Sequence, residues 1–442
     1  MVVNDKNSLL RYNIKSLYIP IKVLSVYLFS TIALYFLGPV KWNIDNGIQL
    51  CLYLVINYIC IIWGYRNRVR REKWRIGRIE EKEYKYRTYW IRFFFVFAIV
   101  SQLIYSFYIY GGISIAKTLN MAQSYLDNRV AERHNNLFTK IITYLWGINY
   151  CYLPCGIIFH KRLNKLDKLL FVAALITNVL FWLSIGTMKG IGDIVFTALI
   201  PLLAVSLKEN VSVKEMLKKI KRNKRTILVL VGGAVCLFGY SSAKRYALRG
   251  HITFSAINKQ LLPFVLEEKM WPLAEITNSV AVYLTHGYTG LAYAMKLPFK
   301  WTYFIGNSRA LTSIIERTFD INFVSSITYC QRLQETFGWA NGSIWPSAFT
   351  WLASDFSFAG LPLVMFMVSS LWAKAVFETI IDKNVWSLIY SSYLTLFFVY
   401  LPMNNQIVQS ERSLYTFILL TIIYIFNSGR LVLTIGSKRI RW

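Results

Sequence analysis

Apolar stretches of roughly membrane-spanning length recur along this chain and are separated by short polar segments. A helix needs about 20 apolar residues to cross the hydrocarbon core of a bilayer. The pattern therefore predicts ten membrane-spanning helices. We place them at residues 17–38, 47–64, 93–110, 139–159, 169–186, 191–206, 226–242, 358–377, 385–401 and 413–427.

One long segment, 243–357, interrupts this alternation and is rich in aromatic residues, Gly, Ser and Asn. Within it, residues 273–298 are moderately apolar and contain Glu275 and His286. This stretch is expected to lie at the membrane interface as an amphipathic or re-entrant helix. Alternatively, it forms two further crossings with the segment that follows, which raises the total from ten to twelve. No internal repeat or low-complexity linker divides the chain, so residues 1–442 are predicted to form one all-α polytopic membrane domain.

The loops between the predicted spans carry unequal positive charge, and this imbalance predicts their side of the membrane. Lys and Arg are concentrated in residues 65–92, in residues 207–225 and after residue 428. The loops on the other side hold one basic residue each. These sparsely charged loops are 39–46, 187–190 and 402–412. Because basic loops remain in the cytoplasm, both termini are predicted to be cytoplasmic and segment 243–357 extracytoplasmic.

The composition of the chain excludes two broad classes of protein, a soluble domain and a nucleic-acid-binding protein. The chain is 55% hydrophobic with a mean hydropathy of +0.40, which is too apolar for a soluble domain of 442 residues. Its net charge of +28 is broken into short blocks between apolar spans, so we exclude nucleic acid as a partner. Such blocks are typical of cytoplasmic loops that meet anionic lipids, and membrane lipids are the expected partners there.

Metal and cofactor chemistry is not expected from the sequence. Cys151 and Cys155 have a C-x-x-x-C spacing, but they lie in an apolar stretch without nearby histidine or carboxylate. Packing is the favoured interpretation of this pair. The chain contains no H-E-x-x-H motif, no phosphate-binding P-loop and no serine-hydrolase elbow.

Four basic residues on the extracytoplasmic side are candidates for binding an anion. Lys189 lies in a glycine-rich turn between two spans, where a charge is costly unless it meets an anion or a wet cavity. Arg245 and Arg249 are four residues apart, so on a helix they would share a face and hold one diphosphate. Arg412 opens the last span. The alternative is that these side chains contact lipid headgroups at the interface.

Other polar and aromatic residues on that side are candidates for catalysis and sugar binding. His286 is a candidate general base near neutral pH, although a lone histidine is often structural. Asp355 directly precedes a span. The segment 338–360 is dense in Trp and Phe, and we consider both sugar stacking and an interfacial aromatic belt for it. Its candidate sugar-binding residues are Trp339, Trp345 and Trp351.

The layout resembles the Wzy-type polymerases of oligosaccharide repeat units, which make O-antigen or capsule. The resemblance covers nearly the whole chain and rests on the spans, the basic inner loops and the large outer loop. The family commonly has arginine in the short turn where this chain has Lys189. Four segments also carry the resemblance, namely GTMKGIGD at 186–193, KRYALRG at 244–250, THGYTG at 285–290 and WPSAFTWLASDFSFAGLPL at 345–363.

The resemblance implies a GT-C-like fold and a glycosyltransferase on the outer face of the bacterial inner membrane, working without a metal. Its substrate would be a polyprenyl-diphosphate-linked oligosaccharide, with a chain-length regulator protein as a further partner. Lys189, Arg245, Arg249 and Arg412 would bind the diphosphate. His286 would be the first choice of base and Asp355 the second. An O-antigen ligase, which has almost the same layout, and a flippase of the lipid-linked repeat unit are the alternative functions.

Overall fold

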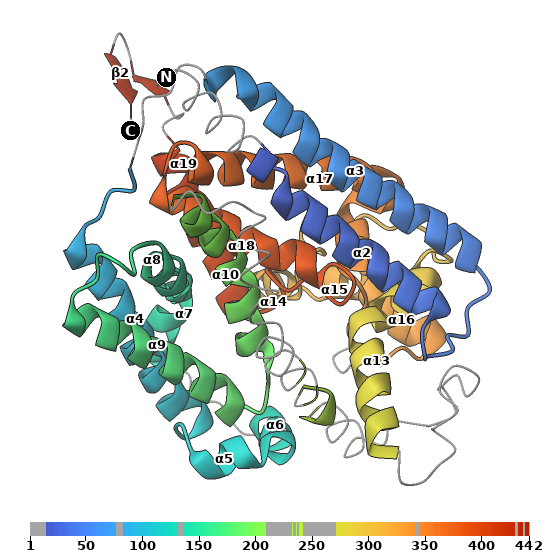
Figure 1. Ribbon diagram of the computed structural model, residues 1–442. Coiled ribbons are helices and arrows are strands. Elements are labelled where there is room, and N and C mark those ends of the chain that lie inside the picture. Colours follow the sequence, from blue (N-terminus) through green and yellow to red (C-terminus); the bar gives the residue numbers. More distant parts are fainter. Residues whose placement is uncertain are drawn as a thin grey trace.

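The computed structural model describes residues 15–76, 83–130, 136–208, 232, 236, 238–241, 271–340, 344–428, 432–435 and 438–441. Within these ranges the regular structure is helical apart from one short hairpin near the C-terminus (Figure 1). The described part of the chain is therefore a helical protein, as its apolar periodicity predicts. The hairpin pairs β1 (Val432–Ile435) with β2 (Lys438–Arg441) in antiparallel register.

Five long helices form the larger part of the bundle, and α18 is the most enclosed of them. Every α18 residue from Ser387 to Tyr400 is buried, because other helices surround it. α18 begins at the N-cap Asn384, whose side chain accepts hydrogen bonds from two backbone N–H groups of the first turn. The five helices are α2 (Ile19–Leu37), α3 (Gly47–Ile76), α10 (Lys189–Lys208), α17 (Ala348–Ile380) and α18 (Val385–Tyr400).

α3 and α17 pack closely along each other, and Gly64 makes this approach possible. A Cβ atom at Gly64 would lie 2.3 Å from the Phe366 carbonyl oxygen, so any other residue would force the helices apart. On either side of Gly64, the ring of Trp63 meets that of Phe366 and the ring of Tyr65 meets that of Trp372, with centroids 5.0 and 5.1 Å apart.

A second group of helices packs against α10. One of its members is broken, because α7 and the segment after it meet at an angle of 51° next to Leu145. The group contains α4 (Thr88–Tyr110), α7 (Leu137–Tyr144), the 3₁₀ turn η1 (Trp146–Tyr150), α8 (Tyr152–Ile158), α9 (Lys165–Ser184) and α19 (Glu411–Asn427). Figure 1 shows α4, α7, α8 and α9 to the left of and below α18, and α19 above it.

The long helices alternate in direction, so the segments between them gather at two ends. At the first, which we call the basic end, Tyr65 donates a hydrogen bond to the Leu17 carbonyl oxygen. Arg92 also pairs with Asp167 at 2.8 Å there, across the starts of α4 and α9. At the opposite end, which we call the loop end, Asp45 and Lys296 form an ion pair that lowers the pKa of the Asp45 carboxyl.

The lengths and compositions of the helices identify a membrane protein. Within the described residues, six helices are long and apolar enough to cross a bilayer, and the bent pair of α7 with η1–α8 makes a seventh if it is one span. The six correspond to six of the predicted spans, and the bent pair corresponds to predicted span 139–159. Predicted spans 385–401 and 413–427 are α18 and α19, which have 16 and 17 residues. Predicted span 226–242 lies largely outside the described residues.

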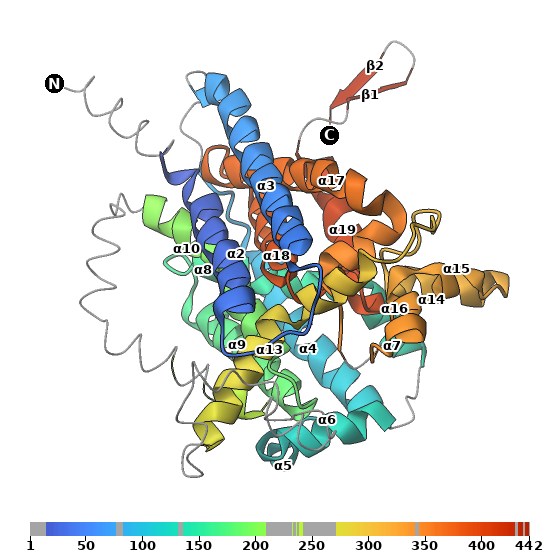
Figure 2. The same cartoon turned by 90° about the vertical axis from the view of Figure 1, so that its right-hand side faces the viewer.

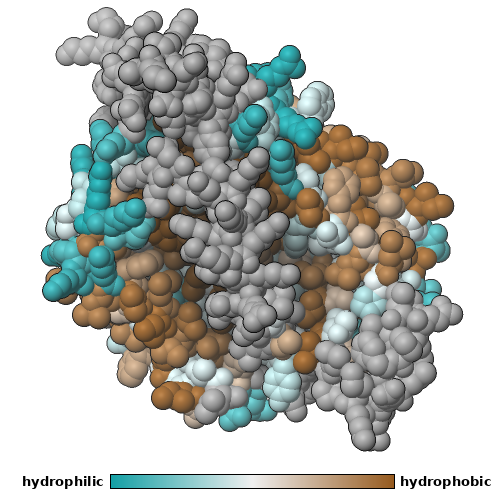
Figure 3. Space-filling model, in the orientation of Figure 1, coloured by the Kyte–Doolittle hydropathy of each residue, from teal (hydrophilic) through white to brown (hydrophobic). Residues whose placement is uncertain are grey.

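Large apolar side chains cover broad areas of the visible surface (Figure 3). Val26, Leu169 and Leu363 are large apolar residues that are 70%, 66% and 62% exposed on three different long helices. A soluble protein rarely exposes such wide apolar areas, whereas a lipid bilayer solvates them. The apolar surface and the lengths of the helices therefore both indicate that the chain is embedded in a membrane.

Five shorter helices and the 24-residue α13 complete the described helices, several of them at the loop end. In Figure 2, α14, α15 and α16 lie together at the right of the molecule, while α5 and α6 lie at the bottom. The stretch predicted at 273–298 is a helix, α13, which packs against α2. These helices are α5 (Ile115–Leu119), α6 (Met121–Val130), α13 (Trp271–Ala294), α14 (Arg309–Phe319), α15 (Phe323–Ile327) and α16 (Tyr329–Phe337).

α17 starts ten residues earlier than the predicted span 358–377. Residues 348–357 were expected in the loop because Thr, Ser and Asp lower their hydropathy. They are helical up to Ser357, whose φ of 57° and ψ of 164° put a kink in α17. The kink divides the helix into a buried first part and a second part that runs along α3.

Candidate functional site

Lys189 and Arg412, two of the four candidate anion ligands, meet on one aromatic ring. The Lys189 ammonium lies 5.0 Å from the centre of the Trp182 ring, and the Arg412 guanidinium lies 5.6 Å from it. The three residues come from α10, α19 and α9, at the loop end of each helix. Trp182 therefore brings together two cations that are more than 200 residues apart in the chain.

Asp193 balances the charge of Lys189. It accepts an ion-paired hydrogen bond from Lys189 at 2.8 Å, one turn away on α10. The hydroxyl groups of Tyr150 and Tyr400 each donate to the same carboxylate at 3.1 Å. Asp193 is 6% exposed, and these three donors stabilise its buried charge. The network also ties α10 to η1 and α18.

Arg412 has no such counter-charge. Its guanidinium is 4.7 Å from the ring centres of both Tyr105 and Trp146, which complete an aromatic cage with Trp182. Its Nη1 atom is buried without a hydrogen-bond partner, and no carboxylate in the described residues forms an ion pair with it. Aromatic faces only partly replace the hydration that a buried cation loses. The cage of Tyr105, Trp146, Trp182 and Arg412 thus carries an unbalanced positive charge.

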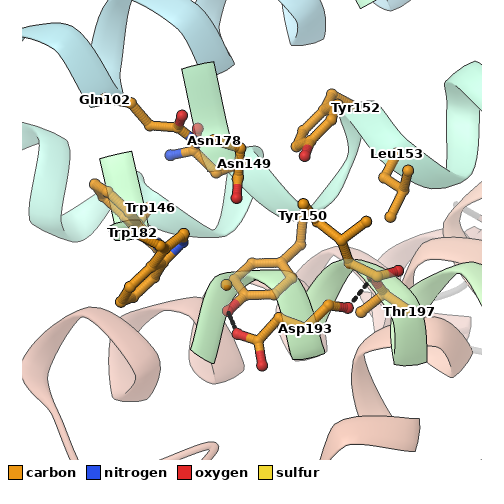
Figure 4. A pocket seen from close by; sticks show the side chains of 12 residues that line it. Gln102, Trp146, Asn149, Tyr150, Tyr152, Leu153, Asn178, Trp182, Asp193 and Thr197 are labelled. Carbon is orange, nitrogen blue, oxygen red and sulfur yellow. Dashed lines mark hydrogen bonds between the residues drawn. The ribbon is translucent and has the colours of Figure 1, made fainter. Parts of the chain in front are cut away.

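A small polar chamber adjoins this cage and shares Trp146 and Trp182 with it (Figure 4). Its volume is about 30 Å³, which is enough for one or two water molecules. Gln102, Asn149 and Asn178 converge on it and carry buried side-chain N or O atoms without hydrogen-bond partners. The chamber offers donors and acceptors together, which suits water or a hydroxyl group.

A much larger groove of about 600 Å³ lies between α14, α15 and α16. Trp351 forms part of its wall, and its indole Nε1 is buried without a partner. The Trp345 ring lies 6.0 Å from that of Trp351, and the Arg309 guanidinium lies 5.3 Å from the Trp345 ring. Two predicted sugar-binding residues therefore stand beside a polar groove. Its polar lining includes Arg309, Ser313, Arg317, Asn322, Gln331 and Gln334.

The first turn of α19 lies between the groove and the cage. Glu411 accepts a hydrogen bond from Arg317 of the groove at 3.1 Å, while its neighbour Arg412 enters the cage. The Ser410 hydroxyl caps this turn and forms a capping box with Ser413. Two adjacent residues thus serve two different sites.

His286 lies apart from both sites. It is 7% exposed on α13 and lines neither the chamber nor the groove. Its Nδ1 is 2.7 Å from the Val282 carbonyl oxygen. A carbonyl oxygen can only accept, so Nδ1 carries the proton and the neutral ring has its lone pair on Nε2. The ring is therefore in the tautomer that accepts a proton at Nε2.

Asp355 is enclosed by a loop. Both carboxylate oxygens accept hydrogen bonds, from the Thr302 hydroxyl, the Gly306 backbone and two groups of Asn307. The Asn307 backbone N–H and side-chain amide donate at 2.8 and 2.6 Å. These bonds anchor loop residues 302–307 to α17, a structural role that the sequence does not reveal.

Three candidate residues from the sequence remain, namely Trp339, Arg245 and Arg249. Trp339 packs edge-on against Tyr293 and donates from Nε1 to the Ile344 carbonyl oxygen at 2.8 Å, away from the groove. Arg245 and Arg249 lie outside the described residues. In the described ranges, no group of three His, Cys, Asp or Glu side chains has an arrangement that would hold a metal ion.

Comparison of this chain with protein-family models, curated proteins and solved structures found no match.

Several residues of these sites were missed by sequence reasoning. Asp193 is four residues after Lys189, a spacing that favours ion pairing on a helix. Gln102, Asn149 and Asn178 are polar residues inside predicted spans, which is itself a functional signal. In contrast, no local signal marks Trp182 among the many aromatic residues of this chain.

Proposed function

We propose that this chain is a polymerase of polyprenyl-diphosphate-linked oligosaccharide repeat units in the bacterial inner membrane. The observation that carries the proposal is the unbalanced charge of Arg412, held beside Lys189 on Trp182. Such a site favours an anion, and a diphosphate at the membrane surface matches its position near the ends of the helices. The groove with Trp345 and Trp351 supplies the aromatic and polar surface that a glycan requires.

The proposed reaction is a single displacement. A hydroxyl of the lipid-linked acceptor repeat attacks the anomeric carbon of the donor chain, and the bond from that carbon to the diphosphate oxygen breaks. The diphosphate leaves with the bonding electrons, and the hydroxyl proton passes to a base, so the anomeric configuration inverts. Arg412 and Lys189, with Arg245 and Arg249, stabilise the departing charge. The proposed reaction does not use a metal ion.

His286 is the proposed base, because a neutral imidazole whose Nδ1 donates to the Val282 carbonyl oxygen can accept the hydroxyl proton. Since His286 lies apart from the cage and the groove, this role requires the acceptor hydroxyl to be presented at α13. The four hydrogen bonds to Asp355 make that residue a poor second choice. A carboxylate whose two oxygens are already occupied has little capacity left to take a proton.

The proposed topology has ten crossings, or twelve if α13 and a neighbouring segment also cross, in a GT-C-like arrangement. It places the basic end and both termini in the cytoplasm and the loop end outside. The hydrogen bond from Asn384 to the Asn427 carbonyl oxygen supports counting α18 and α19 as crossings. It shows that α18 begins where α19 ends, so the two helices run antiparallel between the two ends.

A lipopolysaccharide gel of a deletion strain of the source bacterium, with and without the restored gene, tests the function. We expect core that carries one repeat unit and no ladder in the deletion, with the ladder returning on complementation. Bare core would instead indicate the ligase or the flippase, which differ in the side on which lipid-linked repeats accumulate. An unchanged ladder, together with unchanged capsule, would refute the proposal.

Gly190 provides a test of the cage that removes no charged group. A Cβ atom at this position would lie 1.7 Å from Cδ1 of Trp182, so Gly190→Ala must displace the ring on which Lys189 and Arg412 meet. A shift of about 1 Å in a binding group can lower a rate about 10²-fold, and we expect a loss of polymer on that scale. The matched control is Gly360→Ala, whose new methyl would make only ordinary contacts at 3.8 Å. Equal polymer in both variants would contradict the role of Trp182.

A further inference from the structure

A second cationic site lies at the basic end, far along the helices from the cage. Two open hollows adjoin each other where α2 begins and α3 approaches its end, with volumes of about 520 and 270 Å³. Tyr18 and Arg66 line both hollows, so we treat them as one basic cleft. The other residues that line the basic cleft are Lys15, Lys22, Trp63, Asn67 and Arg70.

The four cations of the basic cleft have no counter-charge in the described part of the chain. Lys15, Lys22, Arg66 and Arg70 make none of the ion pairs found there. By contrast, Arg68 on the same helix does have a counter-charge, since it pairs with Glu72 at 2.7 Å. Four like charges around a shared hollow repel one another, and an anion in the hollow relieves that repulsion.

An apolar surface continues from the basic cleft along the same two helices. Trp63 is 62% exposed at its edge, and Ile59, one turn further along α3, is 53% exposed. On α2, Val23 and Val26 are 56% and 70% exposed directly after Lys22. A ligand that fits this surface has a negatively charged head against the cations and hydrocarbon chains along α2 and α3.

We propose that the basic cleft binds an anionic phospholipid of the bilayer that carries two phosphates. One phosphate would occupy each hollow, with Arg66 between them, and the acyl chains would lie over Val23, Ile59 and Trp63. Basic pockets between helices at the cytoplasmic side recognise lipids of this kind through their headgroups. Tyr18 and Asn67 add hydroxyl and amide donors to the four cations. This site does not depend on the proposed enzymatic function.

Native mass spectrometry of the delipidated full chain in detergent tests the proposal. Diphosphatidylglycerol and zwitterionic phosphatidylethanolamine are the titrated probes. The double variant Lys22→Ala/Arg66→Ala should bind diphosphatidylglycerol at least about tenfold more weakly than the unmodified chain. The control Lys165→Ala/Lys168→Ala removes two exposed cations from the start of α9, at the same end, and should change binding less than about twofold.

Equal weakening in both double variants would overturn the proposal, since it would show attraction to net charge alone. Equal affinity of the unmodified chain for both lipids would also overturn it. Full displacement of diphosphatidylglycerol by equimolar polyprenyl diphosphate would assign the basic cleft to a different lipid and overturn it as well. If the double variant fails to fold, Lys22→Gln and Arg66→Gln are titrated singly, and unchanged affinity in both refutes the site.

Discussion

Replacing Arg412 with alanine should abolish polymer formation while leaving the amount of protein in the membrane unchanged. The guanidinium is held by Tyr105 and Trp146 at 4.7 Å, so it is already in place before the diphosphate leaves. Preorganised groups that stabilise developing negative charge contribute about 10²–10³-fold in rate each. A loss of that size leaves no visible ladder on a gel.

Arg412→Lys refines this expectation. Lysine keeps the charge but loses the planar group that stacks between aromatic rings and binds a diphosphate with two parallel hydrogen bonds. We expect short chains from Arg412→Lys and none from Arg412→Ala. Lys140→Ala, which removes an exposed cation from neighbouring α7, is the matched control and should give normal chain lengths. A normal ladder in Arg412→Ala would remove the main support for the proposed site.

Replacing Asp355 with alanine should lower stability far more than an average substitution. Thr302 and Gly306 are buried, and their donors would lose the acceptor that Asp355 provides. Each buried donor left without a partner costs about 1–3 kcal/mol. The same loop contains Tyr303 and Phe304 with φ of 56° and 62°, a left-handed conformation that bulky residues rarely adopt without support. Loss of the anchor should release this loop.

The melting temperature of the purified protein in detergent measures this effect. We expect a clear decrease for Asp355→Ala and a smaller one for Asp355→Asn, which keeps one acceptor oxygen. Glu335→Ala is the control, because that exposed carboxylate accepts its hydrogen bond from Gln331 on the same helix and does not anchor a loop in the described part of the chain. An unchanged melting temperature together with lost polymer in Asp355→Asn would instead support the catalytic role predicted from the sequence.

The positions of the long helices were largely predictable from the sequence, because the thickness of a bilayer fixes the length of an apolar span. Hydropathy was less informative about where a helix starts. Residues 348–357 are helical although Asp355 and three hydroxyl residues interrupt their apolar pattern. Helix formation needs only suitable backbone angles and hydrogen bonds, and the neighbouring loop buries these polar groups.

The site was predictable only in part. Single candidate residues can be recognised in the sequence, but which of them lie close together in the fold cannot. Lys189 and Arg412 each stand out because each is the single basic residue of a sparsely charged loop predicted outside the cytoplasm. Their convergence on Trp182 depends on how α9, α10 and α19 pack, which no local pattern encodes. The function predicted for Asp355 likewise ignored residues 302–307, about 50 positions earlier in the chain.

In the proposed function, the adjacent positions of Glu411 and Arg412 would couple glycan binding in the groove to diphosphate binding in the cage. A ligand that drew Arg317 into the groove would release Glu411, and a movement of the first turn of α19 would in turn shift the Arg412 guanidinium in its cage. Thermodynamic linkage requires such an effect to be reciprocal, so a bound diphosphate must change the affinity for the glycan by the same factor. The first turn of α19 would then link the occupancy of the groove to the occupancy of the cage.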